Sequence, residues 1–336
     1  MKRPWEILIK TNVHERDISN NFYTGKISNR LQFWLLLIFG VPSLVCSLYI
    51  FYQYLLDRTR RYALQNHVIL LIIMTNIILI CTDFSWMLDS LRRSGHVLSA
   101  TSAFCMIWWF LDFSLYTIQT VLLAWASIER HILIFHNKMV TTTKQKIFYH
   151  YLPPVLILIY LFSFYGVVIF LPPCHNEFEY TSVECGSNPC FLSIEILALW
   201  DSIVHSVLPT LIIAIFSLAL IYRVIAQKKR LRQPIQWRKY RRMSMQLLTL
   251  SAVYLFLNFP LTIIMIVQLF QDTERRFGFG AQLYIFFLTY GVTLSLPFVV
   301  CLNLLSNNKH QHRRISPTLT LSQHQQMFIR DIPKTV

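Results

Sequence analysis

Three aspartates lie within long apolar stretches of a chain that carries few charges. Asp83, Asp112 and Asp201 are flanked by apolar residues, and only 14% of the 336 residues are charged, against about 25% in a typical soluble protein. A carboxylate in a nonpolar environment is costly, so each aspartate predicts a functional site, most simply one that holds a cation. His205 follows Asp201 by four residues, a spacing that places both side chains on one face of a helix.

The apolar stretches around these aspartates are long enough to be membrane-spanning helices. A helix needs about 20 apolar residues to cross a hydrocarbon layer about 30 Å thick. Because lipid offers the backbone no hydrogen-bond partners, we expect helices and not strands, and therefore an all-α membrane protein. A large soluble core is the alternative, but seven such runs separated by short polar loops argue against it. The predicted spans are residues 31–56, 68–90, 103–128, 147–171, 192–222, 244–270 and 280–305.

Basic residues predict the orientation of the spans. With the N-terminus outside the cell, the cytoplasmic loops hold 16 Lys and Arg residues and the extracellular loops hold 4, although the N-terminal tail itself carries 6. Cytoplasmic loops carry the excess of basic residues in membrane proteins, which predicts a multi-pass plasma-membrane protein with a cytoplasmic C-terminus. Its expected parts are an extracellular tail (1–30), a seven-transmembrane domain (31–305) and a mostly disordered cytoplasmic tail (306–336).

Aromatic and basic clusters fit the same arrangement. Trp34, Trp108 and Trp109 lie near span ends, where interfacial anchors occur. Basic residues crowd the third cytoplasmic loop, where we expect them to meet anionic lipid headgroups. They abut two spans and have few interleaved aromatics, so no nucleic-acid partner is expected.

Four cysteines lie on the predicted extracellular side: Cys105, Cys174, Cys185 and Cys190. That compartment is oxidising, and four cysteines allow three disulfide pairings. A zinc site that uses the three cysteines of the loop together with His175 is the alternative, although the loop has no CxxC pair.

A resemblance to a known family becomes specific in the third span. Glu129-Arg130-His131 follows Cys105 at a distance of about twenty-five residues, and single prolines interrupt the last three spans at 209, 260 and 297. This pattern resembles rhodopsin-like G-protein-coupled receptors, which have a seven-transmembrane helix bundle. The resemblance implies that Cys105 pairs with Cys185 or Cys190, and that a heterotrimeric G protein is the partner, with arrestin binding the tail. The coupling residues it implies are Glu129, Arg130, His131, Arg241 and Arg242.

The resemblance also places a ligand pocket at the extracellular end. Asp112 matches the aspartate with which amine receptors hold an ammonium group, and Tyr290 matches a tyrosine that hydrogen-bonds this aspartate. The alternative is that Asp112 only hydrogen-bonds Tyr290 and so holds two helices together. The seventh span has no lysine, so retinal is excluded and no cofactor is expected. Glu177, Glu179 and Glu184 make the mouth acidic, which favours an amine or a basic peptide, such as a neuropeptide. The predicted ligand-binding residues are Asp112, Tyr116, Asp201, His205, Tyr290, Asp83 and Trp86.

Several positions depart from the family's pattern, which predicts a divergent member. Asn76 and Gln119 stand at internal positions where the family's sodium site has Asp and other ligands, so sodium binding is not expected. Asn258 replaces the usual switch Trp. Tyr240 replaces an acidic partner of Arg130, so we expect no ion pair between Arg130 and the sixth span in the inactive state.

Two other classes of protein use intramembrane acids. A transporter or channel is the main alternative, but it predicts paired repeats and broken helices that the sequence does not show. An intramembrane hydrolase needs paired catalytic groups, and Asp112, Asp201 and His205 have no recognised catalytic spacing, so the protein is not expected to be an enzyme.

Overall fold

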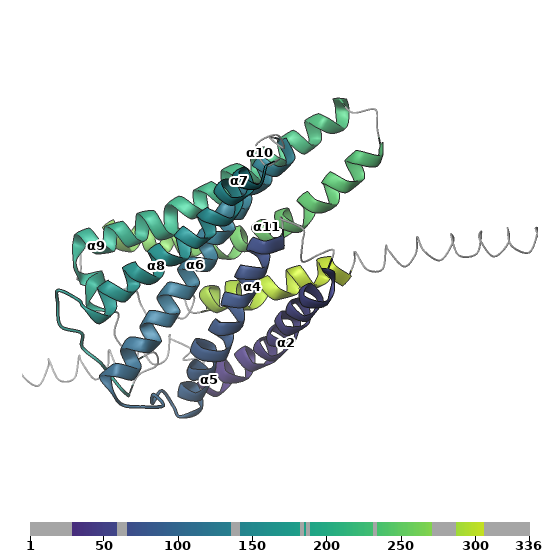
Figure 1. The fold of residues 1–336 in the computed structure, drawn as a ribbon. Helices are drawn as coiled ribbons and strands as arrows, with labels where there is room; N and C mark the ends of the chain where they lie inside the picture. The colour runs from purple at the N-terminus through teal and green to yellow at the C-terminus, as the bar shows by residue number, and fades with distance from the viewer. Residues whose placement is uncertain are drawn as a thin grey trace, which may run out of the picture.

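The described part of the chain forms a bundle of seven helices that are long and apolar enough to cross a membrane (Figure 1). The computed structural model describes residues 29–58, 66–135, 142–181, 185, 189–230, 234–270 and 287–305. Regular structure within these ranges is entirely helical, which confirms the predicted all-α fold and its seven spans. The predicted tails lie outside the described residues, except for the start of the first helix at Asn29.

Each span is a single helix or a succession of helical segments. Spans one to three consist of α2 (Asn29–Leu56), then α4 (His67–Leu79), η2 (Ile80–Phe84) and α5 (Ser85–Arg92), then α6 (Ser102–Phe135). Spans four to seven consist of α7 (Thr143–Lys146), η4 (Ile147–Tyr151) and α8 (Leu152–Phe170), then α9 (Glu195–Trp200), η7 (Asp201–Val207) and α10 (Leu208–Arg230), then α11 (Pro234–Phe270), and finally Phe287–Leu305.

Three of the described spans contain a π-helical segment, and each segment carries an ionisable side chain inside the bundle. Asp83 lies in η2, His150 lies in η4, and Asp201 and His205 lie in η7. A π-helical turn adds a residue to the helix and rotates the side chains that follow it, and such turns are frequent at functional sites. The segments therefore mark where polar groups enter an otherwise apolar bundle.

The third span, α6, lies across the middle of the bundle and packs against α4, α8 and α10 (Figure 1). In the most apolar stretch of spans two, three and seven, 56% of the residues are buried, against 28% in spans one, four and five. Polar side chains of α6 can therefore meet partners from several neighbouring helices without contacting lipid.

The first span approaches the second closely at one glycine. A Cβ atom added to Gly40 would lie 2.3 Å from the ring of Phe84, which is buried. A larger residue at this position would push α2 away from η2, so the missing side chain sets the spacing of the two helices.

The two ends of the bundle carry different chemistry. Cys105 lies in the first turn of α6 and Arg130 lies in its last turns, about 37 Å away at 1.5 Å per residue. We call the end that contains the Cys105 disulfide the disulfide end, and the opposite end the Arg130 end.

Candidate ligand and coupling sites

Two disulfides close the disulfide end. Cys105 bonds Cys185, with the Cα atoms 5.9 Å apart, and Cys174 bonds Cys190, with the Cα atoms 6.0 Å apart. The structure thus selects one of the two partners predicted for Cys105. The zinc alternative is wrong, because all four sulfur atoms are in disulfides and none is a thiolate that could bind a metal.

The disulfide holds the loop after α8 against the start of α6. The backbone N–H of Val97 donates to the carbonyl of Tyr180 over 3.2 Å, and the N–H of Glu179 donates to the carbonyl of Cys185 over 2.9 Å. The first bond joins the loop to the chain between the second and third spans, and the second bond lies within the loop. The loop is therefore fixed in place at the mouth of the bundle.

The side chains of this loop alternate between the bundle and the surroundings. Phe178 is half-buried and stacks on Trp109, with ring centroids 5.1 Å apart, whereas Glu177 and Glu179 on either side of it are exposed. Alternation of this kind is what an extended segment produces when one face packs. Glu177 and Glu179 are therefore exposed to the surroundings at the mouth, whereas Glu184, the third acidic residue of the predicted rim, lies outside the described residues.

Two of the tryptophans predicted to be interfacial anchors lie in the core instead. Trp108 is 1% exposed and Trp109 is 3% exposed, whereas Trp34 is 57% exposed, as an anchor should be. A tryptophan near the end of a span suits either role, and α6 is surrounded by other helices, so its tryptophans are buried.

Asp83 is buried and bound by two protein donors. The indole N–H of Trp108 donates to its Oδ1 over 2.7 Å, and the hydroxyl of Tyr290 donates to its Oδ2 over 3.0 Å. Trp86 packs edge-on against Trp108, with centroids 5.9 Å apart. These four side chains thus meet between the second, third and seventh spans. Trp108 is the one that was not predicted as a site residue from the sequence. Donors on both oxygens allow the carboxylate to be buried.

Asp112 lies farther along α6, on a half-buried part of its surface. It interacts electrostatically with Tyr116, one turn beyond it. The Tyr116 hydroxyl donates to Asn258 Oδ1 over 2.8 Å, and Asn258 Nδ2 donates to Thr210 Oγ1 over 3.0 Å. The residue at the family's switch position thus connects the third, sixth and fifth spans by side-chain hydrogen bonds.

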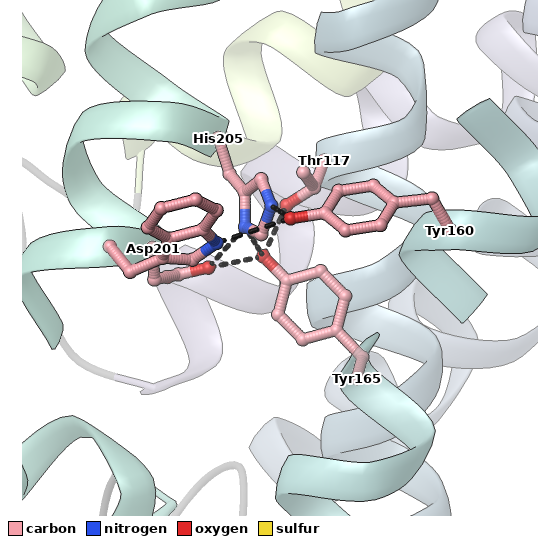
Figure 2. Close-up of polar contacts among 6 residues, drawn as sticks. Thr117, Tyr160, Tyr165, Asp201 and His205 are labelled. Atoms are coloured by element: carbon pink, nitrogen blue, oxygen red, sulfur yellow. Dashed lines mark hydrogen bonds and ion pairs between the residues drawn. The ribbon is translucent and has the colours of Figure 1, made fainter. Parts of the chain in front are cut away.

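Asp201 and His205 contact each other and two tyrosines of α8 (Figure 2). His205 Nδ1 lies 2.9 Å from Asp201 Oδ1, so the two side chains lie on one face of the span, as their spacing predicted. The Tyr165 hydroxyl donates to the same oxygen over 2.6 Å, and the Tyr160 hydroxyl lies 3.0 Å from His205 Nε2. Thr117 of α6 bonds Tyr165 over 2.9 Å. We call these five residues the Asp201–His205 cluster.

This cluster is turned toward α8. The imidazole of His205 also packs edge-on against Phe164 of α8, with ring centroids 4.8 Å apart. Trp200 donates to the Tyr160 hydroxyl over 3.1 Å, and both of these side chains are exposed on the outside of the bundle. The resemblance implied a face that looks into the ligand pocket, whereas the contacts place the pair at the seam between the fourth and fifth spans.

The Glu-Arg-His triplet is buried at the Arg130 end. Glu129, Arg130 and His131 are 2%, 3% and 8% exposed. Arg130 interacts electrostatically with Glu129 and with Tyr54 of α2, and His131 Nε2 lies 2.9 Å from the carbonyl of Phe216 on α10. The triplet therefore contacts the fifth span through His131 and interacts electrostatically with Tyr54 of the first span through Arg130. The two other predicted coupling residues, 241 and 242, lie in α11, and their side chains are outside the described residues.

Two histidines that the sequence did not single out complete this region. His150 of η4 donates from Nδ1 to the carboxylate of Glu129, and its Nε2 lies 2.9 Å from Nδ1 of His67, the first residue of α4. We call this series the Glu129–His150–His67 chain. The available signal was weak, since a histidine near the end of a span is compatible with many roles.

Comparison with known proteins decides between the remaining classes. The model of one family, the 7 transmembrane receptor (rhodopsin family), matches residues 43–299. The chain belongs to this family. No match was found among curated proteins. As a rhodopsin-family member, the protein is a G-protein-coupled receptor and not an enzyme, and the match favours a receptor over a transporter or channel.

Two internal positions of this rhodopsin-family receptor, at which the family's sodium site has ligands, carry neutral amides. Asn76 is fully buried, and neither its Oδ1 nor its Nδ2 has a hydrogen-bond partner among the described residues. Gln119 is also buried, and its Nε2 has no hydrogen-bond partner among the described residues either. An amide cannot supply the negative charge that a cation needs in a membrane, and on this ground the absence of internal sodium binding stays a prediction.

Proposed function

We propose that this rhodopsin-family receptor binds a cationic extracellular ligand at its disulfide end and activates a heterotrimeric G protein at its Arg130 end. The proposed cellular location is the plasma membrane, with the disulfide end outside the cell. Two features support this orientation: disulfides form in an oxidising compartment, and the loops at the Arg130 end carry most of the loop Lys and Arg residues.

The observation that carries the ligand proposal is the position of Asp112 compared with the positions of Asp83 and Asp201. Asp83 is buried and accepts from Trp108 and Tyr290, and Asp201 accepts from Tyr165 and contacts His205. Asp112 and Asp201 are both half-buried, but the Asp201–His205 cluster is turned toward α8, so Asp112 of the central helix α6 is the carboxylate proposed to meet a soluble cation. Asp83, Tyr290 and Trp86 would then act indirectly. Asp83 and Trp86 contact Trp108 of α6, one helical turn before Asp112, and Tyr290 hydrogen-bonds Asp83.

The ligand is an amine or a basic peptide, and the acidic rim favours a peptide. Exposed Glu177 and Glu179 lie on the loop that the Cys105 disulfide fixes above α6. Carboxylates at a mouth raise the local concentration of cations and speed their association. A peptide long enough to reach both the rim and Asp112 would use both sets of charges, whereas a small amine needs only Asp112.

Arg130 is the proposed contact for the G-protein α subunit, with Glu129 and His131 as its neighbours. Arg241 and Arg242 of α11 would add positive charge to the same surface, and anionic lipid headgroups would meet the remaining basic residues of the loop. Hydroxyl residues of the C-terminal tail are proposed to recruit arrestin after phosphorylation.

Replacement of Asp112 tests the ligand proposal. A panel of biogenic amines and amidated basic peptides, read by cAMP, calcium and arrestin recruitment, first identifies an agonist. Asp112→Asn should then lower its potency about ten- to a hundredfold, because a hydrogen bond to a charged group contributes about 1.5–3 kcal/mol. Asp112→Glu keeps the charge and is the matched control. An unchanged dose–response curve for Asp112→Asn, at equal surface amounts of receptor, would contradict the salt bridge.

Charge reversal at the rim separates the two ligand classes. Glu177→Lys with Glu179→Lys should lower the potency of a basic peptide agonist about tenfold, through slower association, and leave a small amine agonist nearly unchanged. Glu177→Gln with Glu179→Gln should give an intermediate loss. A peptide agonist whose potency does not depend on these charges would show that the rim does not select the ligand.

A further inference from the structure

Three ionisable side chains from three spans form a continuous hydrogen-bonded series at the Arg130 end. His67 is the first residue of α4, His150 lies in η4, and Glu129 lies near the end of α6. Glu129 and His150 are 2% and 1% exposed, whereas His67 is half-buried. The series therefore leads from a partly exposed imidazole to a carboxylate in the core.

The donors and acceptors of this series can be assigned from elementary chemistry. An ionised carboxylate only accepts, so His150 donates to Glu129 from Nδ1. A neutral imidazole has one donor and one acceptor nitrogen, so Nε2 of His150 accepts from Nδ1 of His67. His67 then carries its proton on Nδ1, and its Nε2 is an acceptor. Each imidazole thus holds its proton on the nitrogen that faces the next group of the series toward Glu129.

We propose that the Glu129–His150–His67 chain is a proton pathway from the membrane surface at the Arg130 end to the Glu129 carboxylate. A proton binds Nε2 of His67, which becomes an imidazolium. His67 passes its Nδ1 proton to Nε2 of His150, and His150 passes its own Nδ1 proton to Glu129. One proton enters, Glu129 becomes a neutral acid, and both imidazoles end neutral with the proton on Nε2.

The groups that surround this pathway connect it to Arg130. The Tyr151 ring packs against both imidazoles, with centroids 5.6 Å from His67 and 4.5 Å from His150. Arg130 interacts electrostatically with Glu129 and with Tyr54. Neutralising Glu129 removes the attraction between its carboxylate and the guanidinium. The pathway thus regulates the proposed coupling residue, and this consequence rests on the proposed function.

Stability alone does not account for such a series. Burying a carboxylate and an imidazole costs several kcal/mol per charged group, and apolar side chains of similar volume stabilise a fold as well or better. Imidazole is the side chain that gains and loses protons near neutral pH. Two imidazoles in sequence, one of them half-buried, supply what transport of a proton to a buried carboxylate needs.

The test follows the proton directly and needs neither an agonist nor a G protein, so its failure is distinct from failure of the proposed function. The full chain in lipid nanodiscs is taken rapidly from about pH 8 to about pH 5, the range in which imidazoles titrate. Time-resolved infrared spectroscopy records the carbonyl stretch of a protonated carboxylic acid. The band that is missing in Glu129→Gln belongs to Glu129.

His67→Asn is the decisive variant, because its amide keeps a donor for His150 but does not exchange protons in this range. We expect the Glu129 band to form on the order of a hundredfold more slowly than in the unmodified receptor, the effect of losing one positioned proton donor. Tyr151→Phe keeps the ring contacts and should leave the rate unchanged. His67→Gln replaces His67→Asn if the latter does not give a cooperative thermal transition.

Two results would overturn the proposal. One is the absence of a Glu129 band in the unmodified receptor at the lower pH, which would show that Glu129 does not take up the proton. The other is an equal rate of band formation with and without the imidazole at position 67, which would show that the proton reaches Glu129 by another route and that His67 and His150 only support the carboxylate.

Discussion

The two ends of the bundle each hold a carboxylate–imidazole pair, and the pairs differ in the group that meets the second imidazole nitrogen. At the disulfide end, Nε2 of His205 meets the Tyr160 hydroxyl; at the Arg130 end, Nε2 of His150 meets His67. A tyrosine hydroxyl ordinarily ionises near pH 10, and an imidazole near about pH 6.5. The same pair can therefore act as a fixed tether in one place and as part of a proton pathway in the other.

The two pairs also differ in the hydrogen-bond donors that their carboxylates, Asp201 and Glu129, accept from. Asp201 accepts from Tyr165 and His205 together, so it keeps a partner when either is removed. Glu129 accepts from His150 and has Arg130 as an electrostatic neighbour. We infer that the first pair is built to hold the fourth and fifth spans together, and the second to respond to a change in charge.

Removal of each imidazole should separate the two pairs most strongly. His150→Leu takes the imidazole donor from a buried carboxylate, a change that typically costs about 3–5 kcal/mol. His205→Leu leaves Tyr165 in place on Asp201 and should cost about 1–3 kcal/mol, as for a lost buried hydrogen bond. Thermal unfolding of the purified receptor near neutral pH measures both. Equal shifts in the midpoint would mean that the second donor to Asp201 does not matter.

Loss of a disulfide should have a somewhat smaller effect, confined to the disulfide end. Cys105→Ser together with Cys185→Ser should lower stability by about 2–4 kcal/mol and weaken the agonist response, because the loop is no longer held on α6. The infrared response of Glu129 should not change. Cys81→Ser, which removes an exposed free thiol, is the control. A changed Glu129 response in the disulfide variant would contradict this prediction, because it would show that the attachment of the loop affects the proton pathway even without an agonist.

Sodium should have the smallest effect, because the two internal positions that correspond to the family's sodium site carry neutral amides, Asn76 and Gln119. Replacing sodium chloride by choline chloride at equal ionic strength should leave the thermal midpoint unchanged, since Asn76 and Gln119 are neutral amides. Asn76→Asp should introduce a sodium-dependent rise in the midpoint. A sodium-specific shift in the unmodified receptor would show that another group supplies the charge.

Sequence reasoning predicted the spans well and the tertiary contacts unevenly. Hydropathy and length are local properties, and all seven predicted spans overlap helices of the structure. The shared face of Asp201 and His205 was also predictable, because a spacing of four residues places two side chains on one side of a helix. The partner of Cys105 could be narrowed to two cysteines, and only the fold of the loop selected Cys185.

The missed contacts are those between distant parts of the chain. His67 and His150 are 83 residues apart, and no periodicity along the sequence relates them. Trp108 was interpreted as an anchor because its place near a span end fits that role, yet the packing of α6 in the middle of the bundle turns it onto Asp83. The predicted ligand-binding and coupling residues stay predictions, because their roles depend on partners outside the chain.

The sequence by itself determined the membrane spans, the family and the set of ionisable groups that the bundle must accommodate, because hydropathy and short motifs are carried along the chain. Only the tertiary structure decided which of these groups are neutralised inside the protein and which face a ligand or the membrane surface. The physical reason is that a buried charge needs partners within hydrogen-bond distance, and in a helix bundle most of those partners come from other helices.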